Sequence, residues 1–412
     1  MKTKGTLALV SLGCAKNAVD LQVMAGAYLK RGWTLSPDPD RADLAIVNTC
    51  SFIASAREEA EAEIVRALEL KRRGAYGRVI VTGCYPARYP KLEDAFPGVD
   101  GWIGVPSGWE EPKLPGFRLT GKAFAYLKIA EGCAHRCSYC AIPGIRGKYR
   151  SRPLAAVLRE ARALLASGCR ELNVVAQDPM LWGLGDGKGG RPRLNELLWA
   201  LDRLPGKFWV RVLYSYPSEI DDDFVVWMMT SKHAVRYVDL PLQHTVPEVL
   251  VKMNRRRAVD ASLTVPDLLR DLMPDVTLRT TVMTGFPGET EARFRRLLSD
   301  LKRLQFDRLG AFAFSPERGT KAWAMRPRPS RAVAEVREKA VMDQQAAIWK
   351  LKAKRLLGRT FDALVVAPGV ARLACQAPDV DGVTWVDSDA VGSFVRVRLV
   401  RVRGFDFEAE PA

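Results

Sequence analysis

Three cysteines at close spacing are the residues of this sequence best suited to chemistry. Cys133, Cys137 and Cys140 form a C-x3-C-x2-C pattern after the apolar run YLKIA and before a cluster of Arg and Lys. Structural zinc sites use four ligands, usually in two C-x2-C pairs, and no second pair follows. Three thiolates on a four-iron cluster leave one iron open for a small molecule. The pattern therefore indicates such a cluster, and a zinc site with His135 as a strained fourth ligand is the alternative.

The same loop, placed after a first barrel strand, resembles the cluster motif of the radical S-adenosylmethionine (SAM) superfamily. The resemblance implies that Cys133, Cys137 and Cys140 are the catalytic centre and the ligands of a [4Fe-4S] cluster. The open iron of that cluster would bind SAM. Tyr139, just before the last cysteine, is placed to pack beside the bound SAM.

Two later segments also resemble SAM-contacting parts of that superfamily. The segment MTGFPGETEARF resembles a G-x-I-x-G-x-x-E pattern, in which Gly285, Gly288 and Glu289 are the candidates. Its glycines would let the backbone approach a nucleoside. AQDP ends the second barrel strand, where the superfamily often holds the methionine end of SAM, so Gln177 and Asp178 are candidates. Asp178 would serve equally well as a helix N-cap.

A second set of thiols lies in the first third of the chain. Cys14, Cys50 and Cys84 each follow a strand-like run, in SLGCAKN, VNTCSF and VTGCYP. Strand ends of a parallel sheet lie along one edge, so three such loops can converge. Small cysteines are also common core residues, but three equivalent positions favour a second metal cluster with one open iron. Cys169 and Cys375 have no such context, and we interpret both as structural.

Alternating strand-like and helix-like segments predict an N-terminal parallel α/β domain over residues 1–115. TLALVSL, DLAIVNT and RVIVTGC are predicted strands, and the stretches that begin at Ala15 and Ala54 are predicted helices. This alternation is typical of a parallel sheet with helices on its faces. Residues 106–121 are rich in Pro and Gly and are a predicted linker.

A longer alternation predicts a partial (β/α)6 barrel over residues 122–350. Its candidate strands are YLKIA, ELNVVAQ, WVRVLYS, YVDLPLQ, RTTVMTG and RLGAFAFS. In α/β barrels the chemistry lies at the carboxyl ends of the strands, where the cysteine loop and both later segments fall. Residues 330–357 are predicted to be a charged helical connector.

Short strands broken by Pro, Gly and Asp predict a small antiparallel β-barrel over residues 355–412. Its last predicted strand alternates Val with Arg at 395–401, which places the arginines on one face. A basic face on a small barrel suits RNA, and an ordinary solvated face is the alternative.

Composition narrows the class of protein. With 412 residues, the chain is long enough for two or three domains. Its formal net charge of +16 fits an anionic partner such as RNA or a ribonucleoprotein, or serves solubility alone. Eight cysteines do not make a disulfide scaffold, and clustered thiols in a reducing compartment more often bind metal. No window approaches the roughly 18 apolar residues of a membrane span, so we predict a cytoplasmic chain with no membrane contact.

The order of domains and motifs resembles the methylthiotransferase family, which has an N-terminal cluster domain, a radical SAM barrel and a C-terminal TRAM domain. SLGCAKNAVD, IRGKYRSRP and PLQHTVPEVLVKMNRR resemble the type that modifies an aspartate of a small-subunit ribosomal protein, the S-twelve protein, and APDVDG at 377–382 resembles the TRAM pattern. The tRNA-modifying type usually has Ser-Gly after the Gln of the PLQH segment. One departure is DLQ at 20–22, where the family usually has DSE, in a loop that could be adapted to a different substrate.

The resemblance implies two [4Fe-4S] clusters and SAM as cofactors. Cleavage of SAM on the first cluster would give a radical that removes hydrogen from an unactivated β-carbon, and the second would present methylated sulfur. Side-chain acid–base chemistry does not break such a bond, so cofactors must supply the chemistry. Arg136 and Arg146 could tune reduction or face solvent or substrate.

The implied partners are the ribosomal protein, free or on the ribosome, an external electron donor, and RNA through the TRAM domain. Two other functions stay open at this point. A tRNA adenosine methylthiotransferase would share both clusters and differ only in its substrate. An RNA-binding protein without catalysis would instead be colourless and hold stoichiometric zinc.

Overall fold

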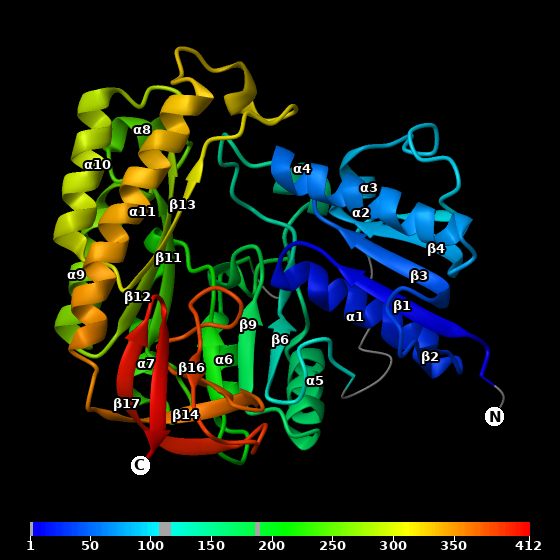
Figure 1. Cartoon of the computed structure of the whole chain (residues 1–412). Coiled ribbons are helices and arrows are strands. Elements are labelled where there is room, and N and C mark those ends of the chain that lie inside the picture. The colour runs from blue at the N-terminus through cyan, green and yellow to red at the C-terminus, as the bar shows by residue number, and fades with distance from the viewer. Residues whose placement is uncertain (1–2, 107–116, 186–189) are drawn as a thin grey trace.

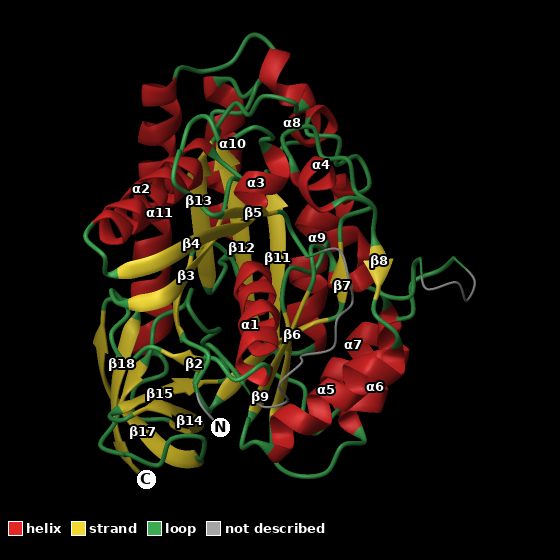
Figure 2. Ribbon diagram, turned by 90° about the vertical axis from the view of Figure 1, so that its right-hand side faces the viewer, coloured by secondary structure: helices red, strands yellow, loops and turns green. Residues whose placement is uncertain are grey.

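The computed structural model of the chain describes residues 3–106, 117–185 and 190–412, which fold into three units (Figure 1). An N-terminal α/β unit lies beside a larger α/β unit, and a small C-terminal β-barrel lies against the lower end of the larger one. Figure 2 shows helix α1 (Ala15–Lys30) between the N-terminal sheet and strand β6 (Phe124–Lys128). The predicted fold class is confirmed.

Five parallel strands form the sheet of the N-terminal unit. In order across the sheet they are β2 (Thr34–Leu35), β1 (Thr6–Ser11), β3 (Ala42–Thr49), β4 (Tyr76–Gly83) and β5 (Gly101–Ile103). The three predicted strands are β1, β3 and β4, and the two edge strands are too short to give a pattern. Most of the predicted linker, residues 107–116, lies outside the described residues.

Helices cover both faces of this sheet, as the alternating pattern predicts. On one face, Leu21 of α1 packs in a buried cluster with Leu44. On the other face, Ile64 of helix α2 (Ala54–Arg72) packs with Val79. Because successive strand residues point to opposite faces, nearly continuous apolar strands allow both helices to dock. Each fully buried aliphatic side chain contributes about 1.5–3 kcal/mol to stability.

Six parallel strands form the central unit as two three-stranded sheets. The strands are β6, β9 (Glu171–Val175) and β10 (Trp209–Val212) in one sheet, and β11 (Tyr237–Gln243), β12 (Thr277–Thr284) and β13 (Arg308–Ala313) in the other. Val210 exchanges backbone hydrogen bonds with His233 and Val235, which joins β10 to the segment before β11. Among the described residues no pairing joins β6 to β13, so the barrel is open, as predicted.

Helices surround these strands and enclose the largest hydrophobic core of the molecule. They are α4 (Ile142–Arg146), α5 (Leu154–Ala166), α6 (Leu194–Asp202), α7 (Asp222–Thr230), α8 (Pro247–Lys252), α9 (Ala258–Leu272), α10 (Glu291–Leu304) and α11 (Arg331–Lys354). The predicted connector is helical, but it is more than a connector. Helix α11 buries Val341 in the barrel core, so it is part of the outer helical layer. No helix within the described ranges is long and apolar enough to cross a membrane.

Five strands close the C-terminal barrel, which confirms the prediction of a small β-barrel. They are β14 (Thr360–Ala367), β15 (Val370–Leu373), β16 (Thr384–Trp385), β17 (Phe394–Arg403) and β18 (Asp406–Pro411). All pairs are antiparallel except β16 with β18. The strand that alternates Val with Arg is β17, so the expectation that it is the last strand was wrong.

The arginines of β17 do share the solvent face, but acidic side chains pair with them. Arg396 bonds to Asp362, Arg398 to Glu410, and Arg401 to Glu408. A register shift between Leu399 and Arg401 keeps the later arginines on the outward side after the alternation breaks. The strand therefore presents a charge-paired surface, which agrees with the ordinary solvated face rather than with a free basic one.

A loop of the C-terminal barrel closes the lower end of the central unit. Buried Arg211 of β10 donates to the carbonyl of Ala374 at 2.8 Å and to the Glu171 carboxylate at 2.8 Å. Tyr126 and Tyr237 donate their hydroxyls to Asp379 and Asp381 of the APDVDG segment. These contacts lie away from the carboxyl ends of the strands, so that end is left for the site.

Candidate active site

All six clustered cysteines line one cavity of about 420 Å³. The cavity lies where the carboxyl ends of the barrel strands face the carboxyl edge of the N-terminal sheet. Polar lining residues come from both units, and apolar residues such as Phe52, Ile145 and Met283 form much of the remaining wall. The two sets of thiols that the sequence predicts separately therefore share a single space.

The barrel cysteines lie in one loop that is closed at its base and held at its tip. Two short antiparallel strands, β7 (Ala130–Glu131) and β8 (Arg150–Ser151), close the base. At the tip, Ser138 donates its amide to the carbonyl of Met253 at 2.9 Å and its hydroxyl to the carbonyl of Lys252 at 2.8 Å. The end of α8 therefore holds the tip of the cysteine loop in place at the carboxyl ends of the barrel strands.

The N-terminal cysteines come together because two glycines allow strand ends to approach closely. Gly13 and Gly83 precede Cys14 and Cys84, and both have positive φ, at 86° and 99°. A Cβ on Gly13 would lie 2.8 Å from Cβ of Cys50, and one on Gly83 would lie 2.6 Å from a backbone oxygen of the neighbouring strand end. Any other residue would be strained there and would push the loops apart.

Asn17 then ties the three strand ends to one another. Its Nδ2 donates to the carbonyls of Leu12 at 3.3 Å and Thr49 at 2.9 Å, and its Oδ1 accepts from the Cys84 thiol at 3.4 Å. Its backbone carbonyl accepts from Asn48 at 2.6 Å. A single amide thus contacts the ends of β1, β3 and β4, which explains the Asn of the SLGCAKN motif.

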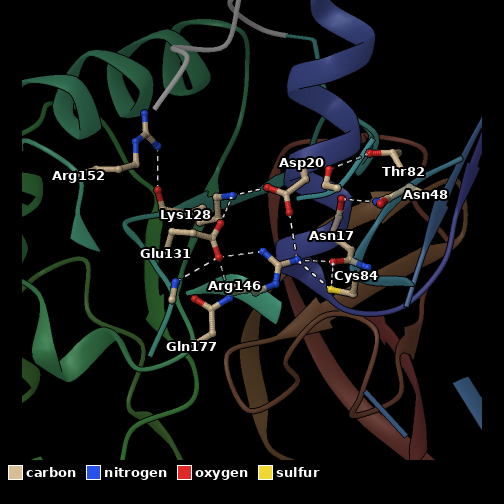
Figure 3. A network of polar contacts seen from close by, with 12 residues as sticks. Asn17, Asp20, Asn48, Thr82, Cys84, Lys128, Glu131, Arg146, Arg152 and Gln177 are labelled. Atoms are coloured by element: carbon tan, nitrogen blue, oxygen red, sulfur yellow. Dashed lines mark hydrogen bonds and ion pairs between the residues drawn. The ribbon is translucent and has the colours of Figure 1, made fainter. Parts of the chain in front are cut away.

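A buried charge network joins the two units beside the thiols (Figure 3). Arg146 bonds to Glu131 at 2.9 Å and to Asp20 at 3.0 Å, and its Nη2 lies 3.5 Å from Sγ of Cys84. Lys128 bonds to the same two carboxylates. With a side chain 1 % exposed, Arg146 is not a solvated arginine, whereas Arg136 is exposed. The two carboxylates balance the charges of the arginine and the lysine.

Burial raises the pKa of thiols in both sets, and Cys14 is the exception. Desolvation raises the pKa of Cys133 and of Cys140 to about 12, and that of Cys84 to about 11. For Cys14, desolvation also opposes ionisation, but the charges of Lys16 and Arg146 lower its pKa overall. Desolvation is the largest single effect, but the two charges and the backbone N–H groups of Lys16 and Asn17 together outweigh it. Cys14 is also the N-cap of α1, where backbone N–H groups favour a thiolate.

His135 is engaged away from the thiols. Its Nε2 lies 2.6 Å from Oδ2 of Asp178, and its ring stacks on Tyr216 with centroids 4.1 Å apart. Among the described residues no group of three or more His, Cys, Asp or Glu converges on one point as ligands of a single metal ion do.

Three candidate SAM-contacting residues line the cavity. Tyr139 packs edge-on against Phe286, with ring centroids 6.3 Å apart. Gln177 donates to Glu131 at 3.1 Å, and its buried Oε1 has no partner. Asp178 accepts from the amide of Met180 at 3.0 Å as the N-cap of a 3-10 turn. The N-cap interpretation is confirmed. The other carboxylate oxygen of Asp178, Oδ2, is bonded to His135, and both residues line the cavity.

The other three candidates lie outside the residues that line this cavity. A Cβ on Gly285 would lie 2.2 Å from Cβ of Ala334 in α11, and one on Gly288 would meet the end of the Lys252 side chain. Glu289 is buried, where it accepts from the Gly285 amide at 2.9 Å and from Arg337. The structure therefore gives these residues packing roles, and their contact with SAM stays a prediction.

Sequence reasoning missed two cations that line the cavity, each over a tyrosine ring. Lys16 Nζ lies 3.5 Å from the ring centroid of Tyr214, and the guanidinium carbon of Arg255 lies 4.0 Å from that of Tyr216. Arg255 Nη1 also lies 3.8 Å from Sγ of Cys137. The motifs SLGCAKN and PLQHTVPEVLVKMNRR contain both residues, but spacing alone gave neither a role. The segment LYSYPS, which follows β10, places Tyr214 and Tyr216 at one strand end. This pair of aromatic residues was the signal that could have predicted nearby cations.

The DLQ departure does not lie in a substrate-facing loop, so that expectation was wrong. The three residues belong to α1, where Asp20 joins the buried charge network and Leu21 packs in the core. Gln22 accepts a hydrogen bond from the amide of Leu119 at 3.3 Å. The departure therefore concerns packing between the units rather than the cavity.

Family models match all three units of the chain. The uncharacterized protein family UPF0004 matches residues 6–104, the radical SAM superfamily matches residues 127–301, and the TRAM domain matches residues 357–411. Radical SAM proteins carry a [4Fe-4S] cluster and SAM, and TRAM domains generally bind RNA.

Curated relatives match almost the whole length of the chain. The ribosomal protein uS12 methylthiotransferase RimO of Moorella thermoacetica is 40% identical, over 98% of this chain and 99% of its own. The protein of the same name from Geobacter sulfurreducens is 37% identical, over 99% and 98%.

Solved structures share the fold at low sequence identity. A radical SAM methyltransferase, TsrM of Kitasatospora setae, with cobalamin and a [4Fe-4S] cluster bound, superposes with a TM-score of 0.55. It is 17% identical, and the match covers 93% of this chain and 82% of that one.

Proposed function

The chain belongs to the RimO family of ribosomal protein uS12 methylthiotransferases, and we propose that it inserts a sulfur atom and a methyl group at the β-carbon of an aspartate of uS12. The observation that carries this proposal is the single cavity lined by two sets of three thiols. One set would serve radical formation and the other sulfur delivery. Their common cavity lets one substrate carbon reach both.

Cys133, Cys137 and Cys140 would hold the first [4Fe-4S] cluster, on whose open iron SAM binds. The fit is good, since three thiols lie in one loop and the nearby histidine is bonded elsewhere. Arg255, 3.8 Å from Sγ of Cys137, supplies a positive charge that offsets thiolate charge. The unpartnered Oε1 of Gln177 offers a hydrogen-bond acceptor for an ammonium group.

Cys14, Cys50 and Cys84 would hold the second cluster on the facing wall. Asn17 and Arg146 contact Cys84 and would fix its orientation, and Lys16 favours the thiolate of Cys14. When both groups are bound, the first supplies the radical chemistry and the second supplies the sulfur. The apolar part of the wall excludes water, which would protect a reactive intermediate from side reactions.

The substrate is assigned through the relatives, whose names state that they act on uS12. Acidic side chains pair with the arginines of β17, which reduces the positive charge that this strand offers to tRNA and agrees with a protein substrate. RNA contact through other surfaces of the TRAM domain, an external electron donor and action on the assembled ribosome are further parts of the proposal.

The direct test uses protein reconstituted anaerobically with iron and sulfide. About eight irons per chain are expected for two four-iron clusters. With SAM and a reductant, uS12 should gain the mass of a methylthio group in place of hydrogen, and unmodified tRNA should not change. Modification of tRNA but not uS12 would establish the alternative function, and a zinc-loaded colourless protein would exclude both enzymes.

A further inference from the structure

One buried cation of the cavity has no acidic partner among the described residues. Lys16 is 9 % exposed, lies in the first turn of α1 and lines the cavity. Among the described residues its ammonium forms no ion pair or hydrogen bond, and it lies over the Tyr214 ring, 3.5 Å from the ring centroid. Burying a charge without a carboxylate partner is costly. The Cys14 thiolate that Lys16 favours offsets part of this cost, and the position of the ammonium on the cavity wall points to a further, anionic ligand.

The carboxylate whose charge acts on Lys16 from within the fold is already committed. Asp239 accepts from the amide of Tyr214 at 3.1 Å and from Nη1 of Arg279 at 2.9 Å. No ion pair within 4.0 Å joins Asp239 to Lys16 in the described residues. By contrast, the other cations of the cavity are engaged: Arg146 with two carboxylates, and Arg255 with the carbonyl of Pro241 at 2.7 Å.

Backbone conformation independently marks the same corner of the cavity. Tyr214 and Gln243 follow or end the adjacent strands β10 and β11, line the cavity and have positive φ, at 71° and 68°. Non-glycine residues with such φ are costly and persist where the surroundings fix them, often at binding sites. Gln243 has no side-chain hydrogen bond within the described residues, so its amide is available to a ligand.

We propose that Lys16, with Tyr214 and Gln243 beside it on the cavity wall, forms the subsite that binds the side-chain carboxylate of the aspartate to be modified. The inference rests on the proposed function and adds the residue that distinguishes an acidic substrate from a neutral one. An ammonium in a cavity pairs with a carboxylate, and Gln243 can donate to its second oxygen. Because Lys16 and Tyr214 belong to different units, docking of the units completes the subsite.

The test compares binding of uS12 with binding of uS12 in which the target aspartate is asparagine. Fluorescence anisotropy is measured on cluster-loaded, oxidised protein without reductant, so no turnover occurs. We expect wild type to prefer the aspartate form by about 30-fold or more, and Lys16→Met to reduce the preference to about threefold or less. Lys16→Arg keeps the charge and should retain most of the preference. The control Lys30→Met makes the same change at the exposed end of α1 and should leave the preference intact.

Three outcomes would overturn the proposal. Lys16→Met could discriminate as well as wild type. It could lose its aspartate preference only in step with loss of iron from the N-terminal thiols, which would mean that Lys16 acts through Cys14 and does not bind the substrate carboxylate. If Lys16→Met does not fold, Tyr214→Leu provides the second test, and an unchanged aspartate preference there would equally refute the subsite. Failure of the proposed function looks different, since wild type would then bind neither form of uS12 and would modify tRNA.

Discussion

The two sets of thiols face the same cavity, but the chain builds them in different ways. The barrel set comes from one loop, and burial raises the pKa of two of its thiols to about 12. The N-terminal set comes from three strand ends, separated by 36 residues from Cys14 to Cys50 and by 34 from Cys50 to Cys84. It contains one thiol, Cys14, whose pKa falls because of nearby positive charge.

The two sets of thiols therefore depend on different parts of the fold for their positions. A loop closed by β7 and β8 keeps its thiols together even if neighbouring elements shift. The N-terminal site depends on the sheet, on Asn17 and on the charge network around Arg146 that joins the two units. The second site should therefore be the more sensitive of the two to changes at the boundary between the units.

The largest expected effect is that of removing one barrel thiol. Cys133→Ala should abolish SAM cleavage and lower iron from about eight to about four per chain, because the first cluster loses one of three ligands. Iron analysis and release of 5′-deoxyadenosine measure this. Cys375→Ala, in the C-terminal barrel, is the matched control and should keep both. Undiminished SAM cleavage in the Cys133 variant would contradict the assignment of the catalytic thiols.

Removing one N-terminal thiol should separate the two activities. Cys50→Ala should retain SAM cleavage and lose transfer of sulfur to uS12, because only the facing site changes. Mass spectrometry of uS12 and assay of 5′-deoxyadenosine on the same sample give both readouts. Retained methylthiolation in this variant would remove the N-terminal thiols from the reaction, and the comparison of the two sites would fail.

A smaller effect is expected at the boundary between the units. Arg146→Leu removes one of the two cations that bond to Asp20 and Glu131 and leaves Lys128, which should destabilise the docked arrangement by about 3 kcal/mol. Hydrogen–deuterium exchange of the first half of α1 should then be faster by about 100-fold. Arg136→Leu changes the exposed arginine of the cysteine loop and should leave this exchange unaltered. Equal protection in both variants would show that the network does not hold the units together.

The positions of both sets of thiols at strand ends could be predicted from short sequence patterns and from their order along the chain. The C-x3-C-x2-C loop is contiguous, and the strand before it is a plain apolar run, so its place at a strand end was correct. The N-terminal thiols could be grouped because each follows a strand, and strand ends share an edge. The two short strands β2 and β5 contain too few residues to show any period.

Long-range contacts were beyond the sequence. Arg255 and Cys137 are 118 positions apart, and no spacing rule connects them. Gly285 fits a nucleotide-binding pattern, yet its missing side chain makes room for Ala334 of a helix that was predicted to be a connector. For Arg146 the sequence left open a tuning role, a solvent-facing position and a substrate-facing position, and most arginines are exposed. Its burial depends on two carboxylates from different units, Asp20 and Glu131.

The smallest expected effect concerns the reactivity of the thiols in cluster-free protein. Iodoacetamide reacts with thiolates, so at pH 7.5 Cys14 should be alkylated at least about tenfold faster than Cys133 or Cys140.

Between pH 7 and 9 the rates of the two barrel thiols should rise about tenfold per pH unit, because their pKa of about 12 lies above this range. The rate of Cys14 should rise less, because its lowered pKa makes it partly ionised already. Peptide mapping by mass spectrometry measures each site. Lys16→Met should slow Cys14 alone, since it removes the charge that does most to stabilise the thiolate. Equal rates for all three thiols would mean that the two sites do not differ in electrostatics, and only the way the chain assembles them would then distinguish them.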